Sequence, residues 1–266
     1  MRQLRYRALA RLAASGGIAV LALQLVFISG CKKSSSPTSP GGGGGLGDLF
    51  PTLNGHYYTY VEYELDASDS HVSGSESYRS STVAGGPVTV MGRSAYVVVD
   101  STFDHNGVFE SVDTLYLSKD ANGDIWLSAG LIASEIPPGT PLPAIPAWLP
   151  ALKQSTGVGN EYTIIAADTT ITEQGISLRL QMTLTGLITA QEQVTTPAGN
   201  FNAYKGRLRI TVVASVSGTT LSSTTADTYM YLAPGVGPVR IYAPTTTSPT
   251  GGSTAGSDQL LRYKNF

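Results

Sequence analysis

Asp120, Asn122 and Asp124 lie two residues apart in an Asp-Ala-Asn-Gly-Asp segment, the spacing at which oxygen ligands begin a calcium-binding loop. The EF-hand pattern continues with Gly at its sixth position and Glu at its twelfth, where this chain has Ile125 and Leu131. An Asn-Gly pair between two apolar runs is also a strong signal for a β-hairpin turn. We therefore predict a plain turn here and keep the three oxygen-bearing residues as weak metal candidates.

The other reactive residue types do not form a recognisable catalytic pattern. The three histidines, His56, His71 and His105, lack the short spacing of zinc ligands. No Gly-x-Ser-x-Gly string, Gly-rich phosphate loop or dinucleotide fingerprint occurs. Glu62 and Glu64 share one face of a strand pattern, but nothing nearby distinguishes them from solvent-facing acids. We predict no catalytic residue and no cofactor, and a hydrolase is the least favoured function.

Aromatic side chains offer the most suggestive binding chemistry. Tyrosine rings on the concave face of a sheet stack against sugars or shield acyl chains, and their hydroxyls add hydrogen bonds. Filling an ordinary core is the alternative role for such rings, and the favoured one. The candidate ligand-binding residues are Tyr58, Tyr60, Tyr96, Tyr116, Tyr229 and Tyr231.

The single cysteine, Cys31, closes the tetrapeptide Ile28-Ser29-Gly30-Cys31. A basic start with four arginines and an apolar stretch over residues 12–28 precede it, which is the layout of a secretory signal peptide. The tetrapeptide resembles the lipobox of bacterial lipoproteins. That resemblance implies removal of residues 1–30 and attachment of acyl chains, palmitate among them, to Cys31. Several such chains anchor a protein stably in a membrane; the alternative is a retained transmembrane helix.

The residues after the cysteine predict where the protein is placed. In lipoproteins of well-studied Gram-negative bacteria an Asp after the cysteine retains the protein in the inner membrane. This chain has Lys32 there, so the resemblance implies the outer membrane, facing the periplasm. Residues 31–48 hold serines, prolines and a run of glycines, and we expect a flexible tether spanning about 20–25 Å. A single domain is expected over residues 49–266, with two small halves as the alternative.

Composition predicts an antiparallel all-β domain and excludes nucleic acid as a partner. Thr, Ser, Val, Tyr and Gly are plentiful, and short Thr/Val/Tyr runs are separated by Gly and Pro. Residues 46–135 contain 3 basic against 13 acidic residues, and residues 136–266 contain 8 against 6. Binding to phosphates requires a basic footprint that neither part has. The acidic part is expected to be a solvated surface, with divalent cations or a cationic partner as the alternative.

Alternation of apolar and polar side chains places the strands and their connections. We expect a Pro-rich crossover loop over residues 136–153, with a helical turn at 147–153, because proline cannot donate a main-chain hydrogen bond to a central strand. Residues 244–258 are expected to form a mobile loop. Strands are predicted at 56–65, 88–100, 108–118, from 125, at 176–185, 207–217 and 260–263, with 71–83 as an edge strand.

Three segments resemble a family of secreted and lipid-anchored bacterial β domains without an assigned function. They are the opening at residues 55–60 (Gly-His-Tyr-Tyr-Thr-Tyr), residues 194–205 with their Pro-Ala-Gly-x-Phe turn, and residues 229–240 with their Ala-Pro-Gly-x-Gly-x-Val turn. The resemblance implies a curved antiparallel sheet, as a half-barrel or an open barrel. It transfers no catalytic residue. The two motifs can also be explained by turn formation alone, without common ancestry, because Pro fixes its own φ and Gly readily adopts positive φ.

These observations favour a lipid-anchored envelope lipoprotein that acts as a non-enzymatic binding or envelope-assembly module. An apolar or glycan ligand would lie against the sheet, and the membrane is contacted through the lipid anchor. The alternative is a structural lipoprotein that docks onto another envelope protein.

Overall fold

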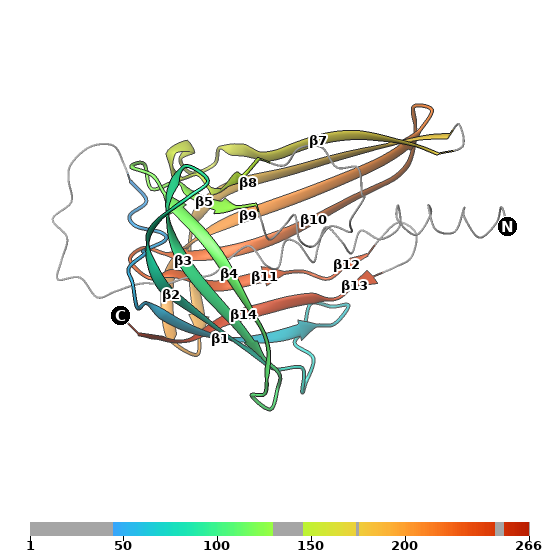
Figure 1. Cartoon of the computed structure of the whole chain (residues 1–266). Helices are drawn as coiled ribbons and strands as arrows, with labels where there is room; N and C mark the ends of the chain where they lie inside the picture. The colour runs from blue at the N-terminus through green and yellow to red at the C-terminus, as the bar shows by residue number, and fades with distance from the viewer. Residues whose placement is uncertain (1–44, 130–145, 174–175, 248–252, 266) are drawn as a thin grey trace.

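The computed structural model describes residues 45–129, 146–173, 176–247 and 253–265 (Figure 1). The predicted signal peptide, Cys31, Lys32 and the tether up to residue 44 lie outside the described residues, as does most of the predicted crossover. In the part of the chain that the structure describes, no helix is both long and apolar enough to span a bilayer.

Within the described residues, twelve antiparallel strands form one curved sheet that nearly closes into a barrel, which confirms the predicted fold class (Figure 1). The order across the sheet is β6-β5-β4-β3-β2-β1-β14-β11-β10-β9-β8-β7. Strands β1 and β14, which come from the two ends of the domain, are therefore neighbours. Their bounds are β1 Tyr57–Leu65, β2 Ser77–Val90, β3 Arg93–Phe103, β4 Phe109–Lys119, β5 Ile125–Ser128, β6 Trp148–Leu152, β7 Glu161–Glu173, β8 Ile176–Thr196, β9 Gly199–Val216, β10 Thr219–Ala233, β11 Gly237–Ala243 and β14 Gly256–Asn265. A separate pair joins β12 (Thr246–Thr247) to β13 (Ser253–Thr254).

Cross-strand pairing explains why the alternating sequences bury one face of each strand. Leu184 of β8 lies opposite Ile210 of β9, and both side chains are buried. Their neighbours Thr185 and Arg209 also pair with each other, on the other face of the sheet. Buried side chains from β2–β11 and the segment before β1 form one large apolar cluster, which fills the space that the sheet encloses.

The open seam of the barrel lies between the edge strands β6 and β7, which follow each other in the chain. The connection between β6 and β7 contains a single turn of 3-10 helix (Gln154–Thr156). Across the seam the hydroxyl of Tyr162 donates a hydrogen bond to the main-chain oxygen of Ala151, 3.2 Å away. The Tyr162 ring lies over Gly186, where an added Cβ would meet ring atoms at 2.3–2.6 Å. A glycine in β8 therefore makes room for the ring that bridges the seam.

Three predicted boundaries differ from the structure. The predicted strand at 88–100 is split by a two-residue turn at Met91 and Gly92, both with positive φ, as hairpins of two such residues require. The predicted helical turn at 147–153 is instead strand β6, whose Pro150 is tolerated because β6 is an edge strand. Residues 71–83 were expected at an edge, but β2 lies between β1 and β3.

The expected mobile loop at 244–258 also differs where the structure describes it. It contains β12, β13 and the first residues of β14. The hydroxyl of Thr245 donates to the main-chain oxygen of Asp66 at 2.8 Å, and its main-chain nitrogen donates to Asp69. The start of this segment is thus held against the β1–β2 loop.

Candidate functional site

The six candidate tyrosines do not form one surface. Tyr58, Tyr60 and Tyr231 are buried in a second apolar cluster, at most 5% exposed, so they fill the core as the alternative interpretation expected. Tyr96 pairs with Leu117 and packs against the main cluster, whereas Tyr116, next to Leu117, faces the other side of the sheet.

Tyr229 remains at the surface, in a row of alternating rings and cations. Its ring stacks on Tyr242 with centroids 6.2 Å apart, and the Lys205 ammonium lies 4.6 Å from its centroid. Arg240 lies 4.9 Å from the Tyr242 centroid. Burial, together with the nearby Asp227 carboxylate, raises the pKa of Tyr229 above its usual value. These rings and cations satisfy one another and leave little free stacking face.

The turn segments that carry the family resemblance converge on the buried tyrosines. Tyr58 donates a hydrogen bond to the main-chain oxygen of Val236, 3.2 Å away, in the turn between β10 and β11. In the β8–β9 turn, the main-chain nitrogen of Ala198 donates to Leu261 of β14 at 3.0 Å. Phe201 packs against the same cluster. These segments therefore have a structural role at one end of the barrel.

A pocket of about 460 Å³ lies on the opposite face of β1 from the buried tyrosines. Tyr57 and Thr59 alternate with Tyr58 and Tyr60 along β1, so they face outward. The pocket lies where β1, β2 and β3 meet the β3–β4 turn. Its lining residues are Tyr57, Thr59, Tyr78, Arg79, Ser80, Phe103, His105, Asn106, Gly107 and Arg262.

Strand pairing brings the aromatic lining together. Tyr78 of β2 lies directly opposite Phe103 of β3, so the two rings share a face of the sheet. Phe103 also contacts Phe109 edge-on, with centroids 6.0 Å apart. Arg262 of β14 places its guanidinium 5.1 Å from the centroid of the Tyr78 ring. The result is an aromatic concavity with one cation at its side.

The polar groups around the pocket have fixed roles. The Arg79 guanidinium is buried and ion-paired with Asp100, which also accepts a hydrogen bond from Ser81 at 2.8 Å. Asp104 precedes the lining residues of the β3–β4 turn and accepts main-chain hydrogen bonds from Val108 and Asn106. The bond from Val108 is the main reason that the Asp104 pKa is lowered, so its carboxylate stays charged and engaged in the turn.

The Asp120–Asp124 segment forms the β4–β5 turn, as predicted. Asp120 accepts hydrogen bonds from the main-chain nitrogens of Asn122 and Asp124, at 2.9 and 3.1 Å. The Asp124 carboxylate accepts two more from Ser155, at 2.8 and 2.6 Å. Among the described residues, no group of three His, Cys, Asp or Glu side chains is placed to hold a metal ion. The Asp120 carboxylate therefore organises the turn, and the Asp124 carboxylate ties it to the 3-10 segment Gln154–Thr156.

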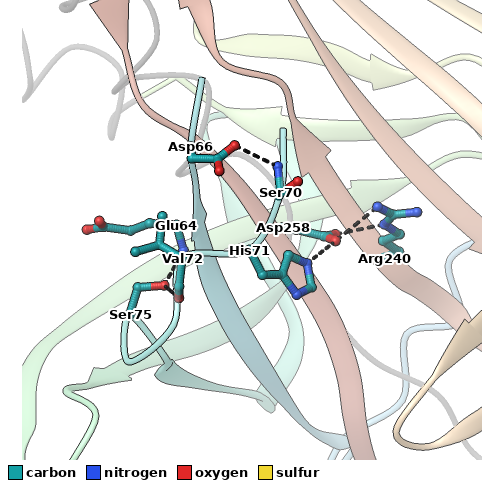
Figure 2. A network of polar contacts seen from close by, with 8 residues as sticks. All are labelled: Glu64, Asp66, Ser70, His71, Val72, Ser75, Arg240 and Asp258. Atoms are coloured by element: carbon teal, nitrogen blue, oxygen red, sulfur yellow. Dashed lines mark hydrogen bonds and ion pairs between the residues drawn. The ribbon is translucent and has the colours of Figure 1, made fainter. Parts of the chain in front are cut away.

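His71 belongs to a polar network between the β1–β2 loop and β14 (Figure 2). Its Nε2 lies 2.9 Å from an oxygen of Asp258, and Arg240 donates to both oxygens of that carboxylate, at 2.7 and 2.9 Å. The Tyr63 ring stacks on the imidazole at 4.2 Å. The Ser75 hydroxyl in Figure 2 donates to the main-chain oxygen of Val72 and accepts a hydrogen bond from the main-chain nitrogen of Glu64 in β1. The arrangement fixes the loop against β14.

The known proteins that are similar to this chain have no stated activity. No protein-family model and no curated protein matches the chain. Two solved structures are similar to it. One is a "putative lipoprotein" of Parabacteroides distasonis, 16% identical with a TM-score of 0.46, the match covering 82% of this chain and 99% of that one. The other is a "putative exported protein with YmcC-like fold" of Bacteroides fragilis, 14% identical with a TM-score of 0.42, covering 82% and 98%.

The aromatic lining of the pocket was not among the predicted site residues. Tyr57 alternates along β1 with the predicted Tyr58 and Tyr60, so it lies on the other face of the strand. Tyr78 and Phe103 fall in segments with weak patterning, and Arg262 comes some 180 residues later in the sequence. Only the pairing of β1 with both β2 and β14 brings them together.

Proposed function

We propose that this protein is a lipid-anchored envelope lipoprotein whose barrel domain is a non-enzymatic binding module. The observation that carries the proposal is the pocket lined by Tyr57, Tyr78 and Phe103. Its volume of about 460 Å³ falls within the range of small-molecule sites, and its lining combines rings with a few polar groups. The ligand, a glycan or an apolar molecule, lies against the outer face of the sheet.

The packing of the barrel supports an outer rather than an inner site. Residues such as Leu117, Ile188 and Leu232, all 0% exposed, belong to the large cluster that occupies the interior. Among the described residues, side chains packed in this way occupy the interior space that a ligand would otherwise fill. The lipobox resemblance of Cys31 and the lysine after it support attachment to the outer membrane, facing the periplasm.

Native mass spectrometry of the domain purified from its own envelope tests the binding function. We expect a bound small molecule on the wild-type domain and its loss from Tyr78→Ala. Tyr116→Ala is the matched control, because Tyr116 is an outward tyrosine on β4 that does not line the pocket. The same bound mass on all three proteins, or none on any, would contradict the proposal.

Labelling with radioactive palmitate tests the anchor. We expect wild-type protein to incorporate the label and to lack residues 1–30. Cys31→Ser should incorporate none and should accumulate as the longer precursor. Unlabelled wild-type protein with an intact Met1 would overturn the lipoprotein assignment.

A docking function is the second candidate, and the exposed apolar side chains of the β3–β4 hairpin favour it. Val108, Phe109 and Val112 are 60%, 56% and 54% exposed on the rim beside the pocket. Apolar side chains gathered at a surface in this way are typical of partner contacts. This function predicts a bound protein in native mass spectra that is lost from Phe109→Ser and kept by Tyr78→Ala.

A further inference from the structure

We infer that the ligand of the outer pocket is an acidic oligosaccharide, an inference that rests on the proposed binding function. The first support is the sign of the charge around the pocket. Residues 46–135 carry 13 acidic against 3 basic residues, yet the described lining of the pocket contains no Asp or Glu, and of its two arginines Arg262 is the exposed one. A concavity kept free of carboxylates within an acidic half of the chain favours an anionic ligand.

Arg262 is the lining residue that would bind the anion. Its side chain is exposed, and among the described residues it forms no ion pair. The cation–π contact with Tyr78, 5.1 Å from the guanidinium carbon to the ring centroid, keeps the guanidinium beside the pocket. A guanidinium held in this way presents paired N–H donors to a carboxylate. Arg79 does not compete for this role, because Asp100 neutralises it within the barrel.

The remaining lining indicates a sugar rather than a fatty acid. Tyr57, Tyr78 and Phe103 offer ring faces, on which the C–H face of a sugar packs. Thr59 and Ser80 add hydroxyl groups beside these rings, and Asn106 adds its amide oxygen, because its amide nitrogen already bonds to His105 and Asp104. A hydroxyl-rich ligand satisfies such groups, whereas an acyl chain would leave them unpaired. The charged Asp104 disfavours an anion at the turn, so the carboxylate is expected on the β14 side.

Trigalacturonic acid and its methyl ester test the inference, because they differ in charge and share one shape. Amide chemical shifts of the ¹⁵N-labelled domain give both the affinity and the site of binding. We expect the acid to bind at least about 10-fold more tightly than the ester, as one charge-assisted contact implies. The shifts should centre on β2 and the β3–β4 turn, and added salt should weaken binding of the acid.

Arg262→Gln should remove the preference for the acid, whereas Arg179→Gln, which alters an exposed arginine on β8, should change it less than about 2-fold. Equal binding of acid and ester in the pocket would overturn the inference and leave the proposed function standing. Absence of binding by both sugars would also overturn it, while the native mass spectra decide the binding function separately. Binding of oleate to the same amides in their place would show that the ligand is a lipid.

Discussion

The hydroxyl of Tyr60 donates a hydrogen bond to the main-chain oxygen of Pro238, 3.1 Å away, with the tyrosine 1% exposed. This bond joins the first strand of the barrel to the start of β11, 178 residues later in the chain. Tyr58 makes the equivalent bond to Val236, two residues earlier. The two tyrosines therefore hold the β10–β11 turn against β1, on the face of β1 opposite the outer pocket.

Tyr60→Phe removes this bond and keeps the ring. We expect the free energy of unfolding to fall by about 1–3 kcal/mol, because a buried carbonyl loses its donor. Urea denaturation measures the change. Tyr116→Phe, at a partly exposed position, should change stability by less than about 0.5 kcal/mol. Equal free energies of unfolding for Tyr60→Phe and the wild type would show that the bond does not stabilise the domain.

Gly186→Ala should destabilise the domain by about 1–3 kcal/mol, since the new methyl group would overlap the Tyr162 ring. Gly206→Ala is the matched control: it lies in β9 and its Cβ would come no closer than 3.4 Å to a neighbour. Tyr162→Ala should cost less in the Gly186→Ala background than in the wild type, which a double-mutant cycle measures. Additive effects would contradict the proposed overlap.

The seam also predicts a dependence of stability on alkaline pH. Burial raises the pKa of Tyr162 to about 12, above the value near 10 that it has in the unfolded chain. Its contribution to stability is therefore complete below pH 10 and is lost as the pH rises toward 12. The loss is at most about 1.4 kcal/mol per pH unit. Urea denaturation between pH 9 and 11.5 should show a steeper decline for the wild type than for Tyr162→Phe; parallel declines would contradict this.

Breaking the buried ion pair of Arg79 and Asp100 should lower the free energy of unfolding strongly, whereas replacing both residues with apolar ones should lower it little. Arg79→Met leaves an unpaired carboxylate in the barrel, and we expect a loss of about 3–5 kcal/mol. The double variant Arg79→Met/Asp100→Leu should recover most of that loss. Arg179→Met, which breaks the exposed pair with Asp168, should cost at most about 1 kcal/mol. A double variant as unstable as Arg79→Met would refute the argument.

The sequence predicts the fold class because apolar alternation and turn residues act locally. In residues 176–184 and 208–216 apolar residues alternate with polar ones, which predicts the buried face of each strand. The Asp120–Asp124 turn is predicted by its Asn-Gly pair. The sequence does not indicate the Met91–Gly92 turn, because a methionine seldom adopts positive φ. It does not place Pro150 in a strand either, because sequence alone does not show which strand lies at an edge.

The candidate site was less predictable, because it depends on pairings between distant segments. Tyr57 and Tyr58 are adjacent and have the same side chain, so the sequence does not show which ring enters the core. Arg79 looks like a surface residue in the sequence, yet Asp100 compensates it inside the barrel. The partner of Tyr78 in the pocket, Arg262, is supplied by the last strand.

Photo-crosslinking in intact cells tests the central claim, that the outer pocket is occupied in the envelope. A benzophenone-bearing amino acid is placed at position 78 in the pocket and, as the control, at position 116 on β4. Irradiation followed by mass spectrometry of the purified protein identifies what is attached. We predict one defined carbohydrate adduct at position 78 and none at position 116. Equal labelling at both positions, or a protein without an adduct at either, would contradict the account.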